Sequence, residues 1–327
     1  MSKTKFIAAL AAAFAFMACE EMVENVQPVC DDETVTLQVN AMTQSTKSTV
    51  DSNGDRVDVV QYLLFHQDGD LEAYRKTSDL SECTFTCTKG MKSVVVIANS
   101  KTDFSSISHI DQMKERKSDL LENTIAAPVM EGVHYVNMER SRSETILLTR
   151  HVSRIMLKSL KLDFGVDHLK NAVVKLKSIY LINLIGEKYY LNQDKDSMLW
   201  YNKRMAEITD KDFIYDDCGE TLLTNGKSYT AKHTFYFYPN DYRNAVDSEE
   251  WSPRATRCVV ELLIDEVLYY YPISFDFITD SNMEHDMNIT ITRLGVSSPD
   301  VAVTSTAFTS EVSVSPWTEG NAINVTF

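Results

Sequence analysis

The cysteines are the residues whose chemistry can be tested most directly from the sequence. Apart from Cys19 there are five, an odd number with irregular spacing that does not fit a disulfide framework: Cys30, Cys83, Cys87, Cys218 and Cys258. On one strand, Cys83 and Cys87 would share a face but lie roughly 13 Å apart, too far to form a disulfide. A zinc site would need Cys218 and Cys258 to join them, and no Cys-x-x-Cys spacing supports one. We therefore expect free thiols and no metal site.

Catalytic motifs are absent from the sequence. No Gly-x-Ser-x-Gly, phosphate-binding loop, dinucleotide-binding glycine motif or His-Glu-x-x-His pattern occurs. Residues 51–55 resemble the start of a calcium loop, but Tyr62 stands at the twelfth position, where a bidentate glutamate is required. His134 and His151 have no neighbour at ligand spacing and are interpreted as hydrogen-bonded strand residues. A carboxylate pair at glycosidase spacing stays open, but the sequence favours a protein that is not an enzyme and needs no cofactor.

Cys19 is the residue whose surroundings indicate a modification. Lys3 and Lys5 precede an uncharged run at residues 6–17, and Ala18 places a small residue directly before the cysteine. These features are typical of a secretory signal peptide, and the run is too short to span a bilayer. The junction resembles a bacterial lipobox, at which the peptide is cut and the cysteine is acylated. We therefore expect residues 1–18 to be a signal peptide and residues 19–32 a lipidated tether on an exported protein.

The acidic charge balance limits the partners of the chain. It has 32 basic and 47 acidic residues, and loss of Lys3 and Lys5 with the signal peptide leaves 30 basic ones, a net charge of −17. Such a surface repels nucleic acid and anionic lipid, so neither is expected to bind. The 327 residues, 44% of them hydrophobic, exceed the roughly 250–300 residues that a single core serves. Two domains are therefore expected.

Alternation with a period of two indicates strands through most of the chain. In residues 34–41, Val35, Leu37 and Val39 alternate with polar residues, which is the pattern of a half-buried strand. Further strands, rich in β-branched and aromatic residues, are expected at 57–66, 84–88, 94–98, 145–162, 173–184, 234–238, 258–263, 267–277 and 287–293. Residues 105–121 are the helix expected in the first half. A boundary at residues 165–168 then gives two β-sandwiches, 33–165 and 166–327.

Two aromatic runs allow a second interpretation of the function. Residues 235–238 read Phe-Tyr-Phe-Tyr, and residues 269–271 are three tyrosines. Aromatic side chains on a strand can form a platform for sugars, but they more often fill the core of a sandwich and its rim. We favour the core, and a glycan-binding surface lipoprotein stays as the alternative from another functional class.

Taken in order, the motifs of the whole chain resemble those of the fimbrillin family, the major fimbrial subunits of type V pili. The best agreement is residues 148–154, Leu-Thr-Arg-His-Val-Ser-Arg, with the family's Leu-x-Arg-x-Val-x-Arg strand. One motif departs from the family pattern: Ser281 and His285 replace an arginine and a tyrosine, while Asn282 remains. Further similarities occur at residues 60–69, 95–99, 127–132, 236–240, 289–295 and 314–317.

The resemblance implies a mainly β protein of two tandem Greek-key (transthyretin-like) sandwiches with few short helices. It also implies assembly at the bacterial outer membrane, where a protease removes the first strand of a lipidated precursor and a terminal strand of another subunit fills the groove. The strand that carries Val35, Leu37 and Val39 is then the displaced one. The candidate donor hairpin lies at the C-terminus, with its apolar face on Val312, Val314, Ile323, Val325 and Phe327.

The position of proteolytic processing stays open between two residues. Many relatives have Thr-Arg where this chain has Thr46 and Lys47, and Arg56 lies at the start of the next strand. An arginine-specific protease would not cut after Lys47. The resemblance therefore allows a stalk or tip subunit, or an anchor that keeps its lipid on Cys19. The partners it implies are other fimbrial subunits, the outer membrane through the lipid, and a host or bacterial surface ligand.

Overall fold

The protein is mainly β in the part of the chain that the structure describes. This computed structural model covers residues 33–43, 56–78, 80, 82–191, 196–203, 209–230, 233–242, 251–274 and 280–300, and the strand backbones at 309–311, 315–316 and 322–326. Its helices are short: α1 (Ile110–Met113), α2 (Asp167–Lys170) and the 3-10 turn η1 (Leu120–Glu122). None of the helices in these ranges has the length and apolar character needed to cross a membrane. All strands belong to the compact unit Thr34–Phe327.

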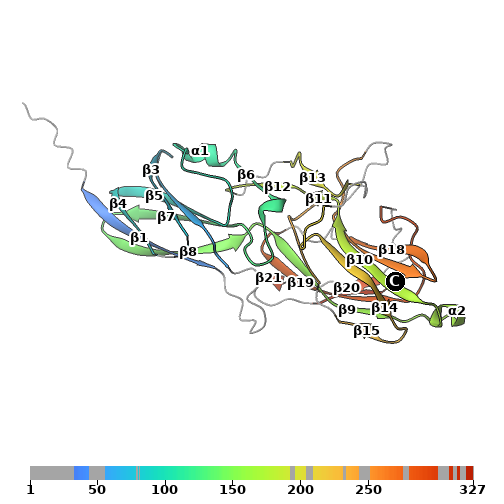
Figure 1. The fold of residues 1–327 in the computed structure, drawn as a ribbon. Helices are drawn as coiled ribbons and strands as arrows, with labels where there is room; N and C mark the ends of the chain where they lie inside the picture. Colours follow the sequence, from blue (N-terminus) through green and yellow to red (C-terminus); the bar gives the residue numbers. More distant parts are fainter. Residues whose placement is uncertain are drawn as a thin grey trace, which may run out of the picture. The chain divides into compact units, whose positions relative to one another are not determined.

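The first group of strands forms a sandwich whose two layers meet at a corner. The strand order is β3 (Leu71–Thr77), β2 (Val60–His66), β5 (Gly90–Ala98), β7 (Met130–Met138), β8 (Arg142–Arg150), β1 (Thr34–Thr43) and β4 (Cys83–Thr88). Neighbours are antiparallel except β1 and β8, which are parallel. β7 and β8 pair over only two residues each, and the sheet folds there. The layers β3-β2-β5-β7 and β8-β1-β4 enclose one core (Figure 1).

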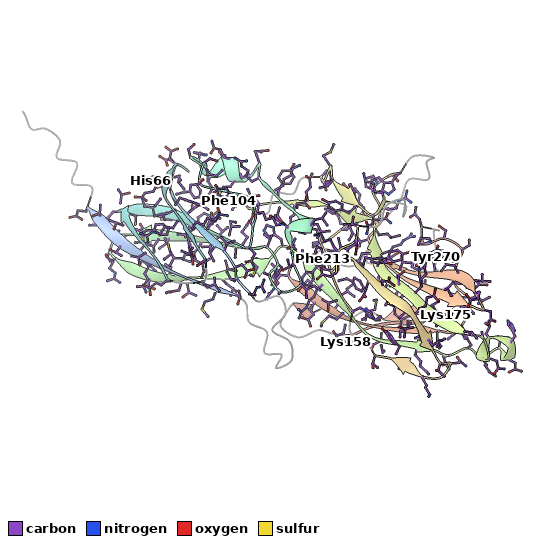
Figure 2. All side chains as sticks on the ribbon, in the orientation of Figure 1. His66, Phe104, Lys158, Lys175, Phe213 and Tyr270 are labelled. Atoms are coloured by element: carbon purple, nitrogen blue, oxygen red, sulfur yellow. The ribbon has the colours of Figure 1, made fainter. Side chains whose placement is uncertain are left out.

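Strands β2 and β5 are buried on both faces, which explains their nearly continuous apolar sequences. On β2, Tyr62 and Leu64 face the core between the layers, whereas Leu63 and Phe65 face a second cluster that includes Phe104. The segment between β5 and β7 covers this second face, and Phe104 of that segment is labelled in Figure 2.

This covering segment shows that the helix predicted at residues 105–121 is wrong. Only Ile110–Met113 is α-helical there. Polar side chains cap short turns instead: Asp103 accepts a hydrogen bond from the Ser105 amide at 3.0 Å, and His109 Nδ1 accepts one from the Asp111 amide at 3.1 Å. The segment β6 (Lys117–Asp119) then pairs with β12 (Glu187–Tyr189), so a non-local partner outweighs the local helical spacing.

The second group of strands forms two facing sheets around a separate core. One sheet has the order β14 (Tyr215–Leu223), β10 (Val174–Ile182), β17 (Arg257–Ile264) and β18 (Val267–Ser274), all antiparallel. The other has the order β15 (Ser228–Tyr229), β9 (Ser153–Leu162), β19 (Met283–Ile291), β22 (Ala322–Thr326) and β20 (Thr309–Glu311). Two more strands extend this second sheet: β16 (His233–Phe237) pairs with β9, and β21 (Ser315–Pro316) pairs with β19. A separate two-stranded sheet consists of β11 (Leu184–Ile185) and β13 (Trp200–Tyr201). Phe213, which is labelled in Figure 2, lies in the core between the sheets together with the run at residues 235–238.

The predicted strand at residues 145–162 is two strands, β8 and β9, separated by His151 and Val152. By its pairing with β16 and β19, β9 belongs to the second sandwich, although the sequence analysis placed residues up to 165 in the first. The apolar alternation continues across the break, and only the pairing partners change. The prediction of a mainly β protein built from two sandwiches is confirmed.

Candidate assembly site

The first strand, β1, is an inner strand of its sheet. It pairs with β4 in antiparallel register from Thr34–Thr88 to Val39–Cys83, and with β8 in parallel register from Leu37–Arg142 to Thr43–Leu148. Figure 1 shows β1, in blue, beside both strands. Its removal would therefore open two backbone ladders at once and separate β4 from β8.

One face of β1 belongs to the core of the first sandwich. Leu37 and Val39 are 0% exposed, and Val35 and Ala41 are also buried, whereas the residues between them are exposed or half-buried. All four contact the cluster between the layers. Each large side chain contributes about 1.5–3 kcal/mol by its burial. The three residues predicted for a displaceable strand thus share one buried face, and the groove beneath them would be apolar.

Strand β4 has β1 as its only ladder partner among the described strands. An ion pair between Glu72 and Lys92 also holds the C-terminal residue of β4, Thr88. Glu72 of β3 accepts hydrogen bonds from the Thr88 amide and hydroxyl at 2.6 and 2.8 Å. Lys92 of β5, with a side chain 1% exposed, lies 2.7 Å from Glu72 and donates to the Thr88 hydroxyl at 2.7 Å. Although burial acts to raise the pKa of Glu72, the hydrogen bonds from Lys92 and Thr88 bring it below its ordinary value. This clamp fixes β4 independently of β1.

Arg56 is the processing candidate that falls within the described residues. Its side chain is exposed and pairs with Asp58 at 2.9 Å. Its backbone is not free, because the Arg56 amide donates to the Ala126 carbonyl at 3.0 Å and the Arg56 carbonyl accepts from Asn99 Nδ2 at 2.9 Å. A protease would have to break both bonds to bind the chain here. Cys19 and Lys47 lie outside the described residues.

The C-terminal hairpin is paired within this chain. β22 runs parallel to β19, with Ile323 opposite Met287 and Val325 opposite Ile289, and β20 pairs with β22 in antiparallel register. Ile323 and Val325 therefore lie on a strand of this chain's own second sandwich, and no ladder that the structure describes joins that strand to the first sandwich. Val312, Val314 and Phe327 lie outside the described residues.

The strand motif at residues 148–154 is held by two buried arginines. Arg150, 1% exposed, donates from its guanidinium to Asn282 Oδ1 at 3.1 Å, and Arg154 binds the Glu284 carboxylate through two nitrogens. Asn282 adopts a positive φ of 61°, which asparagine tolerates better than most residues. The two arginines thus fasten the β8–β9 passage to the start of β19.

Buried charges surround the same passage. His151, 4% exposed, lies 3.4 Å from Glu131, and its burial lowers the pKa of the imidazole. Burial lowers the pKa of Lys188 to about 8, although Glu131 and Asp280 act to raise it. His151 is thus a buried residue paired with Glu131, but it lies in the break between β8 and β9 and not on a strand, where the sequence pattern had placed it.

Comparison with known proteins shows similarity in structure rather than in sequence. No protein-family model and no curated protein matches the sequence. A protein of Bacteroides eggerthii assigned to cell adhesion superposes with a TM-score of 0.65 at 14% identity, over 90% of this chain and 97% of that one. Fimbrilin of Porphyromonas gingivalis superposes with a TM-score of 0.61 at 13% identity, over 89% of this chain and 97% of that one. The chain has the fimbrilin fold.

A third solved structure supports the same fold. A protein of Parabacteroides distasonis, also assigned to cell adhesion, superposes with a TM-score of 0.60 at 15% identity, over 90% of this chain and 97% of that one. In all three cases the match runs through both sandwiches, so the fimbrilin fold accounts for nearly the whole length of the chain. The fold expected from the order of weak motifs is thereby confirmed.

Within the fimbrilin fold, the aromatic runs take the role that the sequence favoured. Residues 235–238 are all buried, and Tyr271 is 1% exposed, so these side chains form core rather than a sugar platform. Tyr269 and Tyr270 are half-buried. The cysteines at 83, 87 and 258 are buried free thiols, as expected.

Sequence reasoning missed two groups of residues. The Glu72–Lys92 clamp was missed because its members lie on different strands with no fixed spacing. Asp216, Cys218 and His233 also come together, from two strands. The alternation of β14 signals that Asp216 and Cys218 share a face, but nothing local signals His233.

Proposed function

We propose that this protein is a structural, non-catalytic subunit of a cell-surface fimbria and that it assembles by strand exchange. The observation that carries the proposal is the position of β1 as an inner strand with a buried face, at the very start of the fold. A proteolytic cut between β1 and β2 would leave β1 attached only by backbone ladders and core contacts. Its release would create a groove of matching length for an incoming strand.

The groove specifies the strand that can fill it. It presents unpaired backbone groups of β4 and β8 on its two sides and an apolar floor where Leu37 and Val39 lay. The incoming strand must therefore carry apolar residues at every second position. The C-terminal segment does so at Val312, Val314, Ile323, Val325 and Phe327. In a neighbouring subunit this segment would leave its own sheet to complete the first sandwich.

The proposal includes export as a lipoprotein. Residues 1–18 direct export, the acylated Cys19 anchors the chain once it has reached the outer membrane, and residues 19–32 form the tether. Cleavage after Lys47 yields a stalk or tip subunit, whereas an uncut chain that keeps its lipid is an anchor. The hydrogen bonds of the Arg56 backbone count against cleavage there, so we take Lys47 as the processing position.

The test compares the chain beginning at Ser48 with the chain beginning at Cys19. We expect the shorter chain to form heat-resistant oligomers on incubation and the longer one to stay monomeric. A synthetic peptide of residues 34–43 should refill the groove and block oligomer formation. The same peptide with Leu37→Asp should not block it, because an aspartate cannot enter the apolar floor.

Each outcome of this test has a distinct meaning. If the chain beginning at Ser48 stays monomeric and unfolds at the same denaturant concentration as the longer one, strand exchange is excluded. If both peptides block oligomers equally, the contact is not the β1 groove. The intact mass of the protein at the cell surface then separates the two subunit roles: a start after Lys47 supports stalk or tip, and an acylated Cys19 supports anchor.

A further inference from the structure

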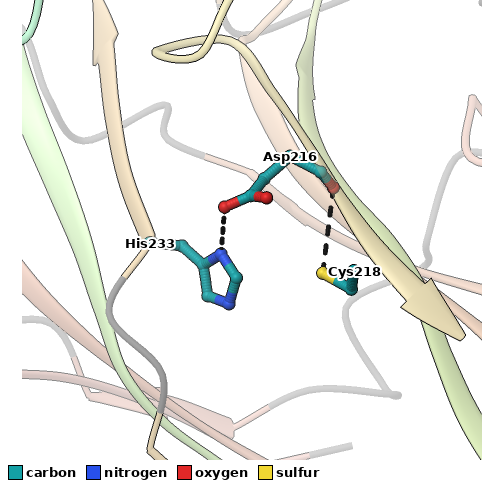
Figure 3. A group of neighbouring side chains, drawn as sticks. All are labelled: Asp216, Cys218 and His233. Atoms are coloured by element: carbon teal, nitrogen blue, oxygen red, sulfur yellow. Dashed lines mark hydrogen bonds and ion pairs between the residues drawn. The ribbon is translucent and has the colours of Figure 1, made fainter. Parts of the chain in front are cut away.

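Asp216, Cys218 and His233 bring three kinds of metal-binding atom together in the second sandwich. Their ligand atoms, a carboxylate oxygen, a thiol sulfur and an imidazole nitrogen, all lie within 4.8 Å of one another. Figure 3 shows Asp216 and Cys218 on one strand and His233 on the strand facing it. No metal site was expected from the sequence, because His233 lies 15 residues from Cys218 and no metal-ligand spacing along the chain joins the two.

The strands explain why these side chains converge. Asp216 and Cys218 are two residues apart on β14, so they share one face of an edge strand. His233 begins β16, which pairs with β9 in the opposite sheet. The cluster therefore spans the two sheets of the sandwich at its edge. His233 is 6% exposed, whereas the Asp216 side chain is 39% exposed, so the group has a buried base and an opening to solvent.

The hydrogen-bond partners of His233 are compatible with two tautomers of its imidazole, one without metal and one with a bound metal. Its Nδ1 faces the Asp216 carboxylate, and its Nε2 lies 3.1 Å from the Tyr229 hydroxyl. In one state Nδ1–H donates to Asp216 and the Tyr229 hydroxyl donates to Nε2. In the other, Nε2–H donates to the Tyr229 oxygen, and the Nδ1 lone pair and the carboxylate both face a cation between them. A bound metal uses the second state, in which Tyr229 orients the imidazole from behind.

We propose that Asp216, Cys218 and His233 form a Zn²⁺ site that links the two sheets of the second sandwich. One sulfur, one nitrogen and one oxygen ligand suit Zn²⁺ better than Ca²⁺ or Mg²⁺, which prefer oxygen alone. Tetrahedral zinc requires ligand atoms about 3.4–3.6 Å apart, which the side chains reach by small rotations. The thiol proton is released to solvent as the Zn–S bond forms, and water completes the fourth position.

The first experiment is a titration of the purified chain with Co²⁺, which reports thiolate ligation by a charge-transfer band in the near ultraviolet. We expect one Co²⁺ per chain, displaced by Zn²⁺, and no band in Cys218→Ser. Asp216→Asn and His233→Gln should weaken Zn²⁺ binding at least tenfold. The matched control is Asp217→Asn, because Asp217 lies on the opposite face of β14. The asparagine can still accept the hydrogen bond that the Gly219 amide donates to Asp217 at 3.0 Å. We expect this variant to bind Zn²⁺ as tightly as the wild type.

A second measurement needs no variant. Zn²⁺ should protect Cys218 from alkylation in the wild-type chain and leave the labelling of Cys83 and Cys258 unchanged, as read by peptide mass. It should also slow amide exchange in β14, because a metal link between the sheets restrains this edge strand. A cobalt band that persists in Cys218→Ser, or equal labelling of Cys218 with and without Zn²⁺, would overturn the proposal.

Discussion

The side-chain amide of Asn99 donates a hydrogen bond to the backbone carbonyl of Arg56 at 2.9 Å. The same side chain accepts from the Asp58 amide at 2.8 Å through its Oδ1, so it bridges the residues on either side of Val57. Asn99 reaches this position with a φ of 61° at the end of β5. Proteases bind their substrates as extended backbone with unpaired N–H and C=O groups. The hydrogen bonds from Asn99 prevent the segment around the Arg56–Val57 bond from binding a protease in this way.

Replacement of Asn99 by glycine should expose this bond to proteolysis. Glycine accepts the positive φ, so Asn99→Gly removes the hydrogen bonds without adding backbone strain. We expect a loss of about 1–3 kcal/mol in local stability and faster tryptic cleavage after Arg56, measured by the mass of the first fragments of a limited digest. Wild-type protein that is cut after Arg56 as quickly as the variant would contradict the protective role of Asn99.

Truncation of Leu37 should destabilise the precursor, which still contains β1. Leu37→Ala removes a fully buried side chain, and we expect a loss of about 2–5 kcal/mol in the free energy of unfolding of the chain beginning at Cys19. Thr36→Ala, on the exposed face of the same strand, should cost no more than about 0.5 kcal/mol. Urea unfolding of both variants measures the difference. Equal losses would mean that β1 does not contribute its predicted face to the core.

The Glu72–Lys92 clamp should make stability depend on pH in the acidic range. The folded pKa of Glu72 lies below its ordinary value of 4.5, so its contribution is complete above that pH and is lost as the pH falls through the lower folded value. We expect Glu72→Gln to cost about 1.5–3 kcal/mol at pH 7, and the difference in stability between wild type and variant to narrow as the pH falls below 4.5.

Unfolding in urea at several pH values checks this prediction. A useful control is Glu139→Gln, since Glu139 is exposed on the turn between β7 and β8. The free energy of unfolding of this variant, plotted against pH, should follow that of the wild type at a constant difference. If the Glu72→Gln gap stays constant from pH 7 to pH 3, the carboxylate is not stabilised by its partners.

The buried thiols should be inert in the folded protein. Burial raises the pKa of Cys83 to about 11, and it also raises that of Cys258, which is 0% exposed. At pH 8 we expect iodoacetamide to label both at least about a hundredfold more slowly than a free thiol of pKa about 8.5. Labelling should become complete in denaturant. Rapid native labelling of Cys83 would show that the β4 end of the sandwich opens readily.

The sequence by itself determined which face of the first strand is buried. The alternation of Val35, Leu37 and Val39 with polar residues requires a half-buried strand whatever its neighbours are, because side chains on a strand point alternately to opposite faces. The same argument placed Cys83 and Cys87 on one face, and both are buried. Burial of residues 235–238 was favoured on a different ground, the frequent packing of aromatic side chains in the core of a sandwich. Each apolar side chain favours burial by itself, so the alternation of apolar and polar residues within one strand is enough to predict its buried face.

Only the tertiary structure decided which strands become neighbours. Nothing around Leu37 indicates that β1 lies between β4 and β8, or that it runs parallel to β8, because ladder partners come from distant segments through backbone groups that every residue shares. The helix predicted at 105–121 was wrong for the same reason, since residues 117–119 found a strand partner seventy residues away in Glu187–Tyr189. Asp216 and Cys218 could be placed on one face from sequence, but His233 joins them only because the two sheets pack together.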